Sequence, residues 1–190
     1  MNRVGIGGAS NVGNTQGAGQ ARPTQQRQSH VQVLEQQIGK IDQQLKGAGW
    51  GANTRELRAL RQDLASELGR VQQALAGNIR LPPQTQAAVD NVTRGLGAEE
   101  KAVVLAKAAE LSDTGYGVEK TSGPRFAANL AMELSEYLAM GATPSSGLSA
   151  AMTKLVQDGM PVFSQNRQLM SDYQNNLATG RQNAAVRNGG

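Results

Sequence analysis

The stretch from Val31 to Leu75 decides the fold class, and it reads VQVLEQQIGKIDQQLKGAGWGANTRELRALRQDLASELGRVQQAL. Its first part places apolar residues at alternating intervals of three and four, which is the a/d repeat of a coiled-coil seam. These residues are Val31, Leu34, Ile38, Ile41 and Leu45. The other positions are mostly Gln, Glu, Lys and Asp, so the pattern predicts an amphipathic helix.

The second part of the stretch has a similar seam, with one step of four followed by four. It runs through Leu57, Leu60, Leu64, Leu68, Val71 and Leu75. Asn53 and Glu56 stand in the N-cap and N3 relation of a capping box at its start. Two helices of similar periodicity joined by a short glycine-rich link predict an antiparallel hairpin. Trp50 falls at its tip, where it would either cap the helix pair or anchor a partner.

Composition supports an all-α fold throughout. The chain has 190 residues, of which 38% are apolar and 3% aromatic, enough for one modest core built from Leu, Val, Ala and Met. Helical patterns separated by Gly and Pro continue to Gly180. We therefore predict a disordered segment at 1–29, a helical hairpin at 30–80, a helical bundle at 81–180 and a flexible tail at 181–190. The Gln-rich faces of the first helix favour a hairpin that projects from the bundle.

The chain offers little for catalysis. It has no Cys and a single histidine, His30, which we expect to be solvated beside the N-terminal segment. The adjacent acids Glu99 and Glu100 fit the first turn of a helix, where the helix dipole favours them. No carboxylate spacing matches a calcium loop. We predict no catalytic residues, no metal and no cofactor.

The net charge is +4, and residues 1–80 hold ten Lys and Arg against five Asp and Glu. Because acids are interspersed among these arginines at helical spacing, without interleaved aromatics, a solvated helix face is the better interpretation. Nucleic acid is not an expected partner. There is also no run of 18 apolar residues, so no membrane span is predicted.

Residues 1–30, MNRVGIGGASNVGNTQGAGQARPTQQRQSH, are rich in Gly, Asn, Gln and Ser and contain no acid. Such a segment cannot bury enough surface to order itself. It lacks the apolar h-region of a Sec signal and, because of its glycines, the helix of a mitochondrial transit peptide. Leading into a Cys-free helical body, it resembles the export signal of proteins secreted by bacterial type III systems. An ordinary flexible tail is the alternative.

A second resemblance concerns the segment TSGPRFAANL, which is similar to the arginine-finger segment of bacterial effectors that activate Rho GTPases. Those proteins carry a Gly-x-Leu-Arg pattern, whereas here Gly123 and Pro124 precede Arg125 without the Leu. The resemblance implies an arginine that stabilises charge on the transferring phosphoryl group. The alternative is a surface arginine at a helix start.

The leading functional hypothesis is a secreted, virulence-associated bacterial protein that acts by protein binding and not by catalysis. Its contact would be the exposed seam of the first helix and the hairpin tip, formed by Leu34, Ile38, Ile41, Leu45 and Trp50. The partner would be a host protein, a component of the secretion apparatus or a secretion chaperone. The chain would lie in a host cell, or in the bacterial cytoplasm before export. The alternatives are a GTPase-activating effector that uses Arg125 and a coiled-coil module that self-associates into a homo-oligomer.

Overall fold

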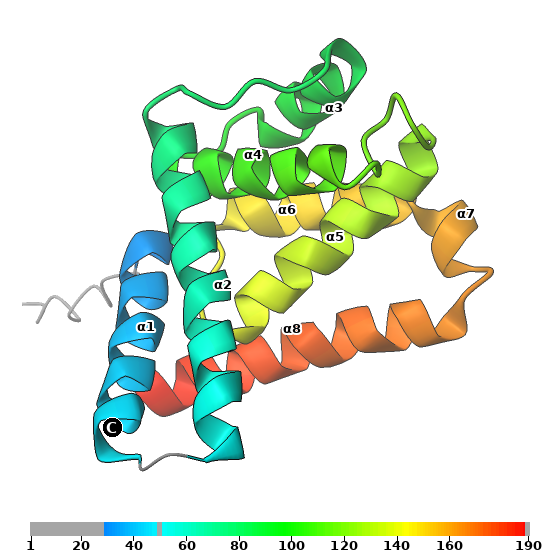
Figure 1. Ribbon diagram of the computed structural model, residues 1–190. Coiled ribbons are helices and arrows are strands. Elements are labelled where there is room, and N and C mark those ends of the chain that lie inside the picture. Colours follow the sequence, from blue (N-terminus) through cyan, green and yellow to red (C-terminus); the bar gives the residue numbers. More distant parts are fainter. Residues whose placement is uncertain (1–28, 49–50, 189–190) are drawn as a thin grey trace, which may run out of the picture.

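The computed structural model describes residues 29–48 and 51–188. All regular secondary structure in these residues is α-helical (Figure 1). The helices are α1 His30–Gly47, α2 Ala52–Leu75, α3 Pro83–Thr93, α4 Ala98–Asp113, α5 Gly123–Ala139, α6 Ser146–Asp158, α7 Met160–Phe163 and α8 Arg167–Asn188. The prediction of an all-α protein is confirmed. The segment predicted to be disordered lies, up to residue 28, outside the described residues.

Helices α1 and α2 form the predicted antiparallel hairpin. Ser29 and Gln32 make a reciprocal capping box at the start of α1. Arg61 donates from Nε to Asp42 Oδ1 at 2.5 Å and from Nη2 to Oδ2 at 3.2 Å, which ties the two helices together. The predicted cap of α2 is wrong: its N-cap is Gly51, so Asn53 lies inside the helix. Trp50 lies outside the described residues.

The hairpin both packs on the body of the protein and projects from it. Its base lies against α4, where Val33, Leu34 and Val71 are almost completely buried. Its other end, which carries the connection between α1 and α2, extends beyond the rest of the protein (Figure 1). The projection expected from the Gln-rich faces therefore holds for the far half of the hairpin.

Helix α5 is the centre of the body, because α4, α6, α7 and α8 all pack against it. Its apolar face is buried throughout and consists of Phe126, Leu130, Leu134, Tyr137 and Leu138. Pro124 lies in its first turn, and Ser122 caps the helix by accepting from the Arg125 N–H at 3.3 Å. The rest of the core is mainly Ala, Val and Leu from the neighbouring helices.

Helix α8 is longer than the sequence indicates. We predicted that it ends at Gly180 and that a flexible tail follows, but the helix continues to Asn188. Gly180 has a different role: it is buried against the C-terminal turn of α5, where a Cβ would lie 2.9 Å from the carbonyl carbon of Leu138. Gly180 therefore allows the two backbones to approach closely.

Candidate functional site

The four described residues of the predicted contact surface are buried or partly buried in the core. Leu34 is completely buried and Ile41 is 5% exposed, while Ile38 and Leu45 are partly buried against the core. These side chains are covered because α2 packs along α1. The prediction of an exposed seam is therefore wrong for Leu34 and Ile41. Trp50, the fifth predicted contact, lies outside the described residues.

The hairpin instead presents an open groove beside the seam, with a volume of 530 Å³. We call it the hairpin groove. It lies between the projecting hairpin and the C-terminal part of α8, near the end of α5. Its lining residues are Gln37, Lys40, Ile41, Gln44, Leu57, Leu60, Leu64, Met140, Asn183 and Val186. Of the predicted contact residues that the structure describes, only Ile41 lines it.

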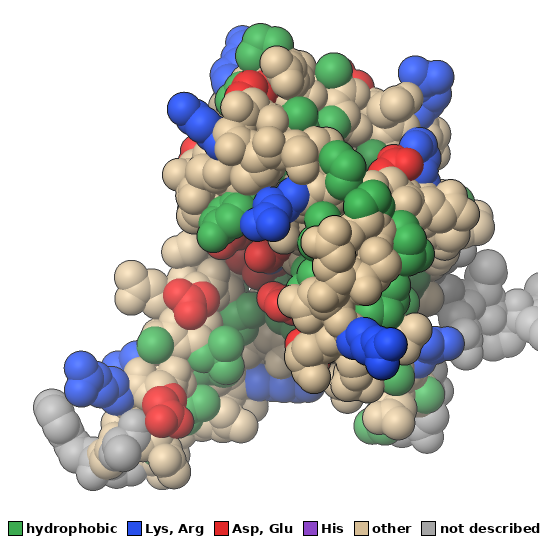
Figure 2. All heavy atoms as spheres, turned by 90° about the vertical axis from the view of Figure 1, so that its right-hand side faces the viewer, with side chains coloured by type: hydrophobic (Ala, Val, Ile, Leu, Met, Phe, Trp, Pro, Cys, Tyr) green, Lys and Arg blue, Asp and Glu red, His purple; other side chains and the backbone are tan. Residues whose placement is uncertain are grey.

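Apolar side chains of α2 form one wall of the hairpin groove. Leu57, Leu60 and Leu64 are spaced by three and four residues, so they share one face of the helix. Leu60 is 49% exposed, and Val186 on the opposite wall is 77% exposed. Figure 2 shows the end of the hairpin standing away from the body, with hydrophobic side chains on its surface. An incompletely covered apolar wall of this kind is typical of an interaction site.

The signal for this groove was present in the sequence. The seam of α2 includes one step of four followed by four, so its apolar stripe departs from a strict heptad, and α1 does not cover all of it. Leu60 is one of the residues left over. The sequence did not indicate which helix would form the second wall, because α8 was expected to end before reaching it.

A buried polar cluster fixes the base of the hairpin on the body. His30, predicted to be solvated, is only 4% exposed, and its ring stacks on that of Tyr137 with centroids 4.8 Å apart. The prediction failed because α1 begins inside the molecule. His30 Nε2 lies 3.8 Å from Glu100 Oε2. Burial lowers the pKa of His30, although Glu100 and Glu99 oppose the shift, so the neutral ring is favoured.

Glu99 and Glu100 cap helices other than their own. Glu99 Oε1 accepts from the Val31 N–H at 3.0 Å, in the first turn of α1. Glu100 Oε2 accepts from the Ser145 N–H at 3.0 Å, at the N-cap of α6. Both acids lie in the first turn of α4, as predicted. They therefore hold the N-termini of α1, α4 and α6 together.

An ion cluster continues this polar layer toward α2. The Lys107 ammonium lies 2.9 Å from Glu67 Oε1 and 3.7 Å from Glu133 Oε2, which joins α4 to α2 and α5. Burial raises the pKa of Glu133, and Lys107 counteracts that shift. This cluster therefore links the base of the hairpin to the body through charged side chains that are mostly removed from water.

Arg125, the candidate arginine finger, is exposed in the first turn of α5. Its accessibility is compatible with either interpretation given above, so the arginine finger stays a prediction. The described residues contain no group of three acidic or histidine side chains able to hold a metal ion. Among the described helices, none is both long and apolar enough to cross a membrane.

Comparisons with known proteins found no matching family model, no matching curated protein and no matching solved structure.

Proposed function

We propose that this protein acts by binding another protein in the hairpin groove, without catalysis. The observation that carries the proposal is the apolar wall of α2, on which Leu60 remains half exposed opposite Val186. A partner that covers both side chains would gain roughly 25 cal/mol for each Å² of apolar surface removed from water.

The shape of the groove favours a helical partner. Its apolar wall is a helix face, and its rim carries polar side chains from Gln37, Lys40, Gln44 and Asn183. An amphipathic helix matches such a site, because its apolar stripe packs on the wall while its polar sides meet the rim. The polar cluster at the base of the hairpin supports this mode, since a wall held in place loses less entropy on binding.

Two substitutions on α2 test the proposal as a matched pair. Leu60 and Leu75 are 49% and 46% exposed, but only Leu60 lines the groove. A photo-crosslinking residue at position 37 should capture a partner, whose affinity is then measured by calorimetry. We expect Leu60→Asp to weaken binding about tenfold or more, as loss of an interface anchor does, and Leu75→Asp to have little effect. Equal affinities of the two variants would contradict the groove as the site.

Self-association is the competing outcome of the same experiment. If the captured partner is a second copy of the chain, light scattering should show a dimer that Leu60→Asp dissociates. That result would support the self-associating module in place of a foreign partner. Secretion chaperones, components of the apparatus and host proteins remain the classes proposed for a foreign partner.

Export by a type III system is proposed on separate grounds, namely the acid-free, Gly- and Gln-rich composition of residues 1–28. Deletion of these residues should stop export from a bacterium carrying such a system, while the helicity of the purified protein stays unchanged. Continued export of the shortened chain would count against the proposal. Binding in the hairpin groove is independent of this outcome.

A further inference from the structure

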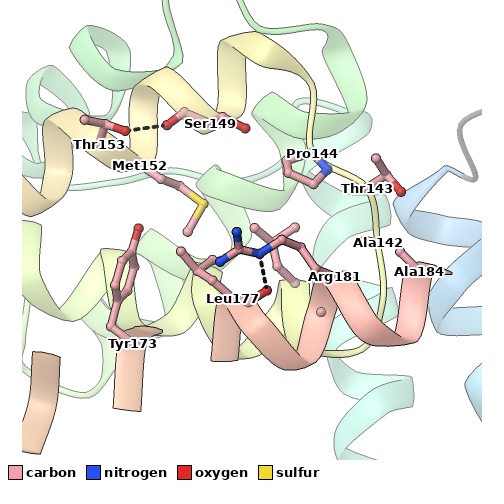
Figure 3. Close-up of a pocket in the computed structure, with 12 residues that line it drawn as sticks. Ala142, Thr143, Pro144, Ser149, Met152, Thr153, Tyr173, Leu177, Arg181 and Ala184 are labelled. Atoms are coloured by element: carbon pink, nitrogen blue, oxygen red, sulfur yellow. Dashed lines mark hydrogen bonds between the residues drawn. The ribbon is translucent and has the colours of Figure 1, made fainter. Parts of the chain in front are cut away.

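A second cavity lies on another side of α8 and takes no part in the hairpin groove. It has a volume of 320 Å³ and is bounded by the end of α5, the connection from α5 to α6, and helices α6 and α8 (Figure 3). Its lining residues are Leu138, Ala142, Thr143, Pro144, Ser149, Met152, Thr153, Tyr173, Leu177, Gly180, Arg181 and Ala184. The volume is at the lower end of the range for small-molecule sites.

One side of this cavity is formed by apolar residues of the core. Leu138, Met152 and Tyr173 are buried core residues that also line it. The ring of Tyr173 packs on Phe163 with centroids 5.9 Å apart, which fixes its orientation. In Figure 3 the Tyr173 hydroxyl points from α8 toward α6 and Met152. A ligand would therefore meet an apolar wall of core side chains and a phenol able to donate a hydrogen bond.

One cation, the exposed Arg181, borders this cavity. Arg181 extends from α8 into the space between α8 and α6 (Figure 3). Its Nε donates to the Leu177 carbonyl at 3.3 Å, which holds the guanidinium in place. Among the described residues, no carboxylate forms an ion pair with Arg181 and no acceptor pairs with its two terminal nitrogens. The guanidinium fork thus presents the donor geometry that carboxylates match best.

We propose that this cavity binds a small amphipathic carboxylate, with its apolar body between Leu138, Met152 and Leu177 and its carboxylate on Arg181. An apolar cavity with a few convergent polar groups is the usual form of a small-molecule site. The cation supplies the selectivity, because an amine of the same length would meet a like charge. A neutral alcohol would fill the same space without the charge-assisted hydrogen bonds.

Three ten-carbon probes test this assignment on the full chain by calorimetry, with decanoate and decylamine kept below their micelle-forming concentrations and decan-1-ol below its solubility limit. Decanoate should bind with one site, decan-1-ol more weakly, and decylamine most weakly. Arg181→Gln should weaken decanoate about fivefold, as expected for an ion pair made by an exposed arginine, and leave decan-1-ol unchanged. Arg167→Gln, an exposed arginine at the start of the same helix, is the matched control.

The position of the ligand is read from methionine methyl resonances. The Met152 methyl lines the cavity, whereas Met160 is 42% exposed elsewhere and should not respond to decanoate. Thr153→Phe, at an exposed position of α6 that lines the cavity, should block both decanoate and the alcohol. Leu60→Asp should leave decanoate binding intact, so failure of the hairpin groove is distinguishable from failure of this site.

Three results would each overturn the proposal. The first is no heat of binding for decanoate up to its micelle concentration. The second is binding without a change at Met152. The third is equal affinity of wild type and Arg181→Gln for decanoate.

Discussion

Replacing Gly180 by alanine tests the contact that sets the position of α8. In an exposed helix interior this change would stabilise the protein by up to about 1 kcal/mol, because alanine has the higher helix propensity. At Gly180, however, the new Cβ would lie 2.9 Å from the Leu138 carbonyl carbon and closer still to its oxygen. Overpacking costs about 1 to 3 kcal/mol. The contacted atoms are backbone, so we expect the upper end and a net loss of about 2 kcal/mol.

Gly69→Ala is the matched control, because Gly69 lies within α2 and has no atom within 4 Å of its Cβ position. We expect that variant to gain up to about 1 kcal/mol. Urea unfolding followed by circular dichroism gives both free energies of unfolding by linear extrapolation. Thermal midpoints should move in opposite directions, by about 2 to 4 °C per kcal/mol for a protein of this size.

Equal stabilisation of the two variants would refute the reasoning. It would mean that α8 does not lie against Leu138, and both proposed sites would lose a wall. Gly180 itself lines the cavity between α6 and α8, and Asn183 and Val186, three and six residues further along α8, line the hairpin groove. A destabilised Gly180→Ala protein should also bind decanoate more weakly than the Gly69→Ala protein does.

The remaining predictions concern titration, capping and catalysis. Burial holds the pKa of His30 below its ordinary value. At a pH between that lowered pKa and about 6.5, the unfolded chain therefore binds one proton more than the folded protein does. The free energy of unfolding should fall as the pH is lowered through this window. Urea unfolding at pH 7 and pH 5 should show a smaller loss for His30→Phe than for wild type; equal losses would exclude a buried neutral histidine. Burial tends to raise the pKa of Glu119, but hydrogen bonds from the Thr85 hydroxyl and from the backbone N–H groups at the start of α3 outweigh it, and the net shift is downward. Glu119→Gln should therefore unfold at lower urea concentration than wild type at pH 7, with the difference shrinking as the pH falls through the lowered pKa, whereas exposed Glu136→Gln should unfold like wild type. Arg125→Ala should abolish any stimulation of Rho GTP hydrolysis, and a wild-type protein that gives no stimulation would remove the arginine finger from consideration.

The parts of the fold that were predictable depend on residues close together in the chain. The spacing of apolar residues at three and four predicted both hairpin helices, and their antiparallel pairing followed from the short link. Gly77 follows the end of α2, where a helix commonly ends on a glycine. It has a positive φ of 75°, and the N–H groups of Gly77 and Asn78 donate to the carbonyls of Ala74 and Gln73, as in a Schellman motif.

The candidate sites were less predictable because they join distant segments. Ile41 lies in the hairpin groove, but Leu34 and Ile38, which share its seam, turn toward the core. The second wall of the groove comes from α8, more than a hundred residues later in the chain. The cavity around Arg181 likewise requires α6 and α8 to lie side by side, and no pattern of neighbouring residues in the sequence indicates that contact.

The amino-acid sequence by itself determined that this chain is helical, where its hairpin bends and which acids begin α4. Only the tertiary structure decided that His30 is buried and that Gly180 is a point of close approach. It also decided that Glu99, Glu100 and Glu119 cap the N-termini of α1, α6 and α3, which lie elsewhere in the chain. The residues joined by these caps are 68, 45 and 35 positions apart. Helix periodicity acts over one or two turns, whereas a cap or a close contact forms only when packing has brought two remote segments together.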